Sequence, residues 1–491
     1  MSASAEVCEL RGEIRHWRRS RADTSLYEAL SDAYIAVFAV VLLGSMTISA
    51  VLNVRQTAGD SCTSAGCLET RALLPWLVAL TGVLLVVVAA RMFGPLFVSP
   101  AVSSWLLPTW ADRAALLRPR LLRSALLAVA LGAAVALGGA SLGGFSGSAI
   151  VLLTLSAGLA GLATLCFAAS SQTREDSGAR LLTWALAAVI WLGLMVLALG
   201  RGRVTSPPDG SLAWIVGVVA GGLAVVLLLA RVVRRLGTVR RVHLLAGGAL
   251  APSLSGALAG LDLALAYDVL LARRWRNHPP VRSRRGGPAG AKALVWLDLV
   301  RVTRSPHSLL LLAAAVVIPY VAETADLGDA VLLVASLTGF VAGLGLCSSL
   351  RVVGRTPGLA RMLPFPDATT RAATIVVPSA AMIAYGLATG PALHGATGAS
   401  WAVTWYLALA VGGSSTAAAV RWVTGRPPDY SRPLVSSPAG AIPTNLYGSA
   451  VRGFDIALLT IAPVLIWPTD NGALFSLALS GITLSYLTSR K

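Results

Sequence analysis

The chain alternates between long apolar stretches and short polar segments from Tyr34 to its C-terminus. A helix needs roughly 20 apolar residues to cross the hydrocarbon core of a bilayer, and uncharged stretches near that length recur along the sequence. They predict an all-α, polytopic membrane protein with about twelve transmembrane helices. In the first half, the predicted spans are Ala33 to Val54, Ala72 to Ala90, Ser124 to Leu142, Ala149 to Ala169, Leu181 to Gly200 and Ala213 to Ala230.

The second half repeats this rhythm with six further apolar stretches. The one from Ile456 to Trp467 is short for a straight span, and Pro468 to Gly472 then turns the chain, so a re-entrant hairpin is the alternative there. The predicted spans are Ser308 to Val321, Ala330 to Leu350, Ala372 to Gly390, Ser400 to Val420, Ile456 to Trp467 and Gly472 to Thr488.

The segment from Leu244 to Ala272 is also apolar and long enough to cross. Arginines flank it on both sides, and it carries Asp262 and Asp268, which are costly in the middle of a bilayer. We therefore expect an interfacial or re-entrant segment rather than a crossing.

Composition and charge support the same class and give an orientation. The 491 residues are 56% hydrophobic and 13% charged, with a mean hydropathy of +0.73, which is far from a soluble domain. With twelve spans, both termini face one side, and only Arg55, Arg71, Arg201 and Arg203 face the other; the positive-inside rule makes the arginine-rich side cytoplasmic. The net charge of +18 then reflects cytoplasmic loops and the lipid surface rather than nucleic-acid binding.

The composition also bears on where the protein resides. Arginine outnumbers lysine 38 to 2, and alanine and glycine are abundant, which indicates a GC-rich genome and a bacterial inner membrane. A charged N-terminal segment precedes the first apolar stretch, so no cleavable signal peptide is expected.

Two of the five cysteines share the first outward loop. Cys62 and Cys67 either form a disulfide in an oxidising compartment or remain two free thiols. Cys8, Cys166 and Cys347 show no ligand-like spacing to a histidine, so we expect no metal site.

The two halves look duplicated. Each begins with an amphipathic segment containing a tryptophan, Glu13 to Arg19 and Leu294 to Arg301, which we expect to lie at the cytoplasmic membrane surface. Two spans, a polar loop and four further spans follow in each half, as in transporters built from paired repeats. The predicted organisation is residues 1–230 as the first half, 231–291 as a basic cytoplasmic linker with the interfacial segment, and 292–491 as the second half.

The predicted spans contain no Asp, Glu, Lys, Arg or His, although ion-coupled carriers usually bind their coupling ion with such residues. The chain also lacks a phosphate-binding loop: the nearest stretch, Gly286 to Ala293, has no glycine directly before its lysine and no Ser or Thr directly after it. Any driving energy is therefore expected to come from another chain, and we expect no catalytic residue here.

The polar loops between spans 2 and 3 and between spans 8 and 9 echo each other. The first contains Leu107-Pro108 and Asp112-Arg113, and the second contains Leu363-Pro364, Asp367 and Arg371. Each Asp is suited to cap a short helix, the preceding Pro turns the chain into it, and the Arg offers a charged contact to a partner.

With these loops, the chain resembles the membrane (permease) subunit of an ABC exporter, as two fused six-span halves of the type-2 family. The resemblance implies that both loops dock on a cytoplasmic ABC ATPase, present in two copies or as a fused pair, which carries ATP and Mg²⁺. It also implies outward movement of a hydrophobic or amphipathic substrate. The second loop departs from the first by inserting Ala368-Thr369-Thr370 before its arginine.

Two other functions remain open at this stage. A membrane scaffold or assembly factor with an exporter-like fold would show no substrate-dependent rise in ATP turnover. A polytopic lipid-modifying enzyme would need an essential carboxylate at one membrane surface, such as Asp60, Glu323 or Asp326, but the outward acidic residues are scattered over separate loops.

Overall fold

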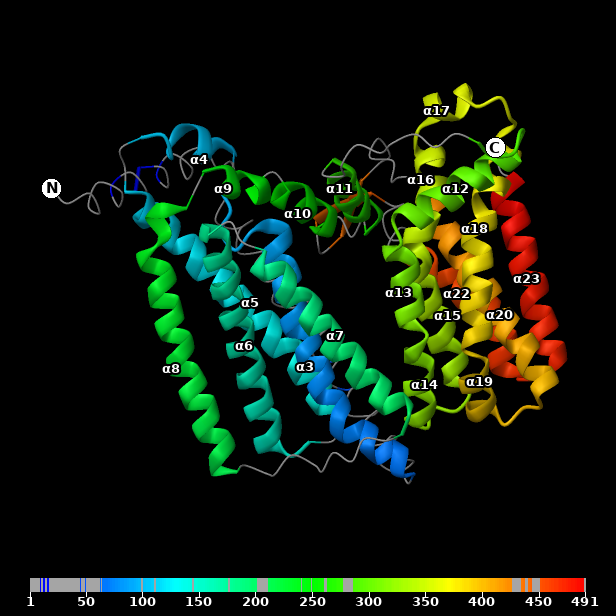
Figure 1. Cartoon of the computed structure of the whole chain (residues 1–491), viewed down its shortest axis with the longest axis horizontal. Coiled ribbons are helices and arrows are strands. Elements are labelled where there is room, and N and C mark those ends of the chain that lie inside the picture. Colours follow the sequence, from blue (N-terminus) through cyan, green and yellow to red (C-terminus); the bar gives the residue numbers. More distant parts are fainter. Residues whose placement is uncertain are drawn as a thin grey trace. The chain divides into compact units, whose positions relative to one another are not determined.

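The structure is a computed structural model of the full chain (Figure 1). It describes residues 9, 12, 13, 16, 45, 49, 62, 64–98, 100–109, 112–143, 145–174, 177–200, 211–239, 241–248, 250–259, 263–276, 286–425, 434–437, 440–443 and 451–489. The predicted first span, Ala33 to Val54, and the first amphipathic segment, Glu13 to Arg19, lie almost entirely outside these residues.

The chain divides into two compact units. One comprises residues 1–193, 202–256 and 436–441, and the other comprises 194–201, 257–435 and 442–491. Both are built from helices, and the described strands, β1 (Leu434–Ser437) and β2 (Gly440–Pro443), form a single two-stranded sheet.

Five long apolar helices of the first half match predicted spans. They are α3 (Ala65–Phe93), α5 (Arg113–Leu142), α6 (Gly147–Arg174), α7 (Gly178–Ala198) and α8 (Leu212–Arg234), and the short helix α4 (Pro100–Trp105) lies between α3 and α5. Helices α3, α5 and α6 pack closely through small residues: a Cβ at Gly132 of α5 would lie 2.7 Å from the carbonyl oxygen of Ala157. By contrast, only 6% of the most apolar part of α8 is buried, which is typical of a helix that faces lipid.

The second half forms a bundle around α20 (Trp401–Thr424) (Figure 1). Of the most apolar stretch of this helix, 72% is buried. The other elements are α12 (Lys292–Arg304), α13 (His307–Ala315), α14 (Val317–Thr324), α15 (Ala330–Gly343), η2 (Leu344–Cys347), α16 (Ser348–Arg355), α17 (Pro357–Met362), α18 (Asp367–Ala388), α19 (Gly390–Thr397), α22 (Phe454–Ile466) and α23 (Asp470–Ser489).

Buried hydroxyl groups link α20 to its neighbours. Ser414 shares a hydrogen bond of 2.8 Å with Ser336 of α15 and accepts one of 2.7 Å from Thr460 of α22. Ser476 of α23 donates to the Thr460 carbonyl at 2.5 Å. Without water in the bilayer core, such bonds satisfy polar groups and hold helices together, at about 0.6 kcal/mol each on average.

The described residues contain ten helices long and apolar enough to cross a membrane, and the prediction of a polytopic helical membrane protein is confirmed. The number twelve is not reached. The predicted first span lies outside the described residues, and α22, at 13 residues, is shorter than a straight crossing requires. Two spans are composite: α13 and α14 form one, and α15, η2 and α16 form the other.

Short helices occupy the apolar segment before the second half: η1 (Leu236–Thr238), α9 (Arg241–Gly248), α10 (Ala251–Ala259) and α11 (Leu263–Arg276). None reaches crossing length, in agreement with an interfacial or re-entrant segment. Within the predicted linker, α11 continues through Arg273 to Arg276. The boundary between the compact units falls at residues 256 and 257, inside the linker that we predicted over 231–291.

A disulfide joins Cys62 and Cys67, whose Cα atoms are 5.6 Å apart, so of the two alternatives for these cysteines the structure has the bridge. It spans the beginning of α3, where the Ser64 hydroxyl accepts a hydrogen bond of 3.1 Å from the Cys67 amide. The bridge and the cap together fix the start of this helix.

We expect the protein, denatured without reductant, to leave Cys62 and Cys67 unlabelled by a maleimide. Reduction should add two labels, because it opens this bridge, whereas Cys166 and Cys347 are free in both conditions. Intact-mass spectrometry measures the difference, and Cys62→Ser should add one label before reduction. Full labelling of all five cysteines without reductant would contradict the bridge.

Candidate functional site

The first predicted contact loop contains α4 and the turn after it. Trp105, the last residue of α4, is 79% exposed, whereas Leu107 is 2% exposed and packs in a cluster with Leu96, Leu117 and Leu121. Pro108 is exposed. Leu107 therefore anchors the loop, and Trp105 and Pro108 are exposed.

Asp112 caps a helix, as its position predicted. Its side chain accepts a hydrogen bond of 2.9 Å from the Ala114 amide, and its carbonyl accepts one of 3.1 Å from Leu116. The capped helix is the 30-residue span α5 and not a short contact helix, so that part of the prediction was wrong. Because the carboxylate is engaged in the cap, the exposed charge here is that of Arg113.

The second predicted loop contains α17. Its last residue, Met362, is 82% exposed. Leu363 follows in an extended conformation, Pro364 is exposed, and Asp367 is the first residue of α18, with Pro366 at the cap position and no capping bond from a side chain. The expectation that Asp367 caps this helix was therefore wrong, although a carboxylate in the first turn still favours the helix dipole. Arg371, one turn later, is half-buried.

The two loops share a further feature, which we did not predict when we compared their sequences. Each has a six-residue helix that begins at a proline and ends in a large, exposed apolar side chain, Trp105 or Met362. In both, a Leu-Pro pair and then a transmembrane helix follow. The signal was present in the sequence as Pro100 and Pro357, each five residues before the apolar one.

A buried ion pair lies next to the span that leads into the second loop. Asp298 of α12 is 2% exposed and accepts hydrogen bonds of 2.8 Å from Arg301 and 2.6 Å from Ser349 of α16. Arg301 also donates to the Leu346 carbonyl at 2.6 Å and to the Ser348 hydroxyl. The amphipathic helix α12 is thus clamped to the end of the span that leads into α17.

A second buried charge holds α11 against the same span. Arg351 of α16 is 1% exposed; its Nε donates to Asp268 at 2.5 Å and its Nη2 to the Ala264 carbonyl at 2.7 Å. The guanidinium carbon lies 5.1 Å from the ring centre of Tyr267 and 4.9 Å from that of Trp422. Cation–π contacts of this kind are stronger when the cation is desolvated.

A cavity of about 340 Å³ lies beside this support. It is lined by residues of α12, α16, α17 and α18, with Leu363 of the second loop and Asp298 among them. The Oδ2 atom of Asp298 is buried and has no hydrogen-bond partner among the described residues. Leu363 of the second loop therefore faces the same cavity as the hydrogen-bonded pair Asp298 and Arg301.

The described residues contain no group of three or more His, Cys, Asp or Glu side chains placed to hold a metal ion. Among the charged side chains of α11, α12 and α16, Asp298 pairs with Arg301, and Asp268 pairs with Arg351 and Arg355.

Comparisons with known proteins give one match. The sequence model of a family of unknown function, DUF6297, matches residues 67–433, more than half of the chain. No curated protein and no solved structure matches the chain. The matched region runs from α3 through both contact loops to just past α20, so one family unit contains both.

Proposed function

The chain belongs to the DUF6297 family, whose function is unknown, and we propose that it is the membrane-spanning permease subunit of an ATP-driven exporter. The observation that carries this proposal is the matched pair of loops. In each, a six-residue helix ends in one large, exposed apolar side chain, Trp105 or Met362. Exposed aromatic and methionine side chains are typical anchors of protein interfaces.

In the proposed mechanism, a cytoplasmic ABC ATPase, in two copies or as a fused pair, binds both loops. ATP and Mg²⁺ bind to the ATPase, which closes on ATP binding and moves the loops. The movement of α17 passes into α16 and, through Asp298 and Arg301, into α12. Because these elements are clamped together, they shift as one body, and the spans rock between inward-open and outward-open states.

The proposal includes the finer topology. The chain has twelve spans in two repeated halves, with Ala33 to Val54 as the first and α22 as the eleventh. Both termini and both loops lie on the cytoplasmic side of a bacterial inner membrane. The cargo is hydrophobic or amphipathic, since the buried residues of the described spans are apolar or carry hydroxyl groups, apart from Arg351 at the end of one span.

We expect Trp105→Glu combined with Met362→Glu to abolish binding of the ATPase. Truncation of an interface anchor typically costs 2 kcal/mol or more, so two charged replacements should lower affinity by more than about a hundredfold. The measurement is affinity purification of the detergent-solubilised chain from its native host, with the captured ATPase identified from its own phosphate-loop peptides by mass spectrometry. This variant leaves the Asp112 cap intact.

The matched control is Leu327→Glu, an exposed apolar residue outside both loops. It should keep the ATPase, and both variants should elute from a sizing column like the wild type. If the wild type captures no ATPase, or if its complex shows no rise in ATP turnover with any hydrophobic cargo, the exporter proposal fails and a scaffold function takes its place.

A further inference from the structure

The first unit contains an apolar groove between α6 and α8. A cavity of about 380 Å³ is lined by Ser156 and Trp214 at one end and by Leu228 at the other. A second cavity, of about 220 Å³, begins at the same Leu228 and continues to the end of α8. The two cavities share Leu228 and together line α8 from Trp214 to Arg235; we refer to them jointly as the groove.

The long part of the groove suits a hydrocarbon chain. Gly217 and Gly221 of α8 line it, and a Cβ built on either glycine would meet no atom within 4 Å. Trp214 closes the far end with a hydrogen bond of 3.3 Å from its ring nitrogen to the Ser156 hydroxyl. The space is thus elongated and apolar, and it lies beside a helix that is almost unburied.

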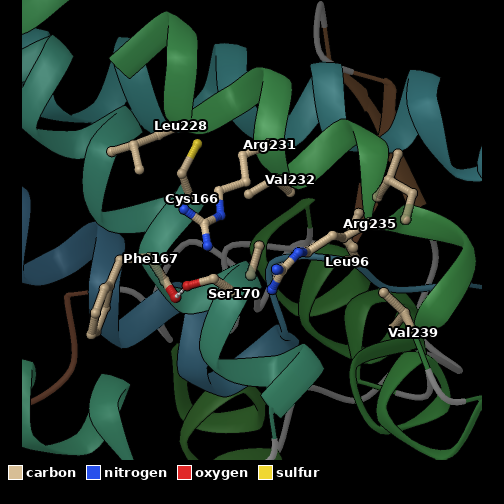
Figure 2. A pocket seen from close by; sticks show the side chains of 11 residues that line it. Leu96, Cys166, Phe167, Ser170, Leu228, Arg231, Val232, Arg235 and Val239 are labelled. Atoms are coloured by element: carbon tan, nitrogen blue, oxygen red, sulfur yellow. Dashed lines mark hydrogen bonds between the residues drawn. The ribbon is translucent and has the colours of Figure 1, made fainter. Parts of the chain in front are cut away.

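The short part of the groove is basic. Arg231 and Arg235 line it, four residues apart and hence on one face of the helix end, and both are exposed. Figure 2 shows both side chains directed into the cavity, toward Ser170 of α6. Neither cavity is lined by an Asp or Glu, and neither arginine forms an ion pair with a residue that the structure describes. Two cations beside each other without a counter-ion favour an anionic ligand.

We propose that this groove binds an anionic phospholipid, with its phosphate at Arg231 and Arg235 and one acyl chain between α6 and α8. The charge, the apolar length and the position at a helix end all match one lipid molecule in the leaflet on that side. Basic pockets between transmembrane helices are known to bind acidic headgroups. The proposal does not rest on the exporter function, because none of the predicted contact residues of the two loops lines either cavity.

The test uses the full chain, purified in detergent, delipidated and mixed with equal amounts of phosphatidylglycerol and phosphatidylcholine of identical acyl chains. Native mass spectrometry counts the lipids that stay bound. We expect the wild type to prefer phosphatidylglycerol, and Arg231→Ala with Arg235→Ala to lower that preference by about tenfold. Gly221→Leu, which fills the groove without a clash, should lower retention of both lipids.

Arg234→Ala is the matched control, because Arg234 lies in the same turn and is exposed but does not line the cavity. It should retain the wild-type preference. Equal retention of the two lipids by the wild type, or an equal loss in Arg234→Ala and the double variant, would overturn the proposal. Displacement of phosphatidylglycerol by millimolar inorganic phosphate alone would also overturn it, since the site would then bind a free anion without need of the acyl chain.

Discussion

Asp268→Asn should destabilise the second unit by about 3 kcal/mol, because it leaves the guanidinium of Arg351 buried and without its carboxylate partner. Asp268 is itself one-third exposed, with a side-chain exposure of 34% against 1% for Arg351. The opposite change, Arg351→Met, should therefore cost less. It leaves a carboxylate that water reaches, and it places a side chain of similar length between Tyr267 and Trp422.

The measurement is thermal unfolding of the detergent-solubilised protein, where a change of this size should lower Tm by several degrees. Trypsin cleavage after Arg273 and Arg276 should accelerate as α11 is released. In the double variant, Asp268→Asn with Arg351→Met, part of the loss should return, since no charge is then buried unpaired. Arg304→Met, at an exposed position of α12, is the control and should behave like the wild type. Equal losses in Asp268→Asn and Arg304→Met would contradict a buried ion pair.

Only one half of this ion pair could be predicted from the sequence. Asp268 was predicted to disfavour a membrane crossing, and α11 is indeed too short to cross. Its partner could not be predicted, because Arg351 lies 83 residues further along the chain. Nothing in the local pattern distinguishes a buried arginine at the end of a span from the many exposed ones that follow the positive-inside rule.

Features that depend on local sequence were predicted better. The lengths of the apolar stretches predicted the described spans, and the Asp112-Arg113 pair before an apolar stretch predicted the cap of α5. The same logic failed at Asp367, because Pro366 occupies the position that a capping side chain needs. The exposed ends of α4 and α17 were missed, since an apolar residue in a loop is read as a core residue until its packing is known.

The strongest effect on folding is expected from Gly412→Leu, at a close approach of α18 and α20. A Cβ at Gly412 would lie 2.8 Å from the Cα of Ile383 and 2.9 Å from the carbonyl oxygen of Met382, both backbone atoms that cannot swing away. A Cβ at Gly386, on the facing helix, would lie 2.3 Å from the Ala408 carbonyl oxygen. Glycine lets the two backbones touch here, as small residues do at many membrane helix interfaces.

Because α20 is the central helix of the second unit, separating it from α18 would also strain the hydroxyl contacts to Ser336 and Thr460. Overpacking typically costs 1–3 kcal/mol for a side chain that can adjust and more where backbone must move. We expect Gly412→Ala to lower Tm by about 5 °C. For Gly412→Leu, we expect little or no monodisperse protein after detergent extraction.

Gly481→Leu supplies the matched control, because it makes the same change in α23 at a position where a Cβ would meet no atom within 4 Å. It should be recovered in wild-type yield with a wild-type Tm. Recovery of Gly412→Leu with the stability of Gly481→Leu would mean that α18 and α20 do not approach as described. A graded loss from Gly412→Ala to Gly412→Leu, with Gly481→Leu unaffected, would instead tie the stability of the bundle to this one backbone contact.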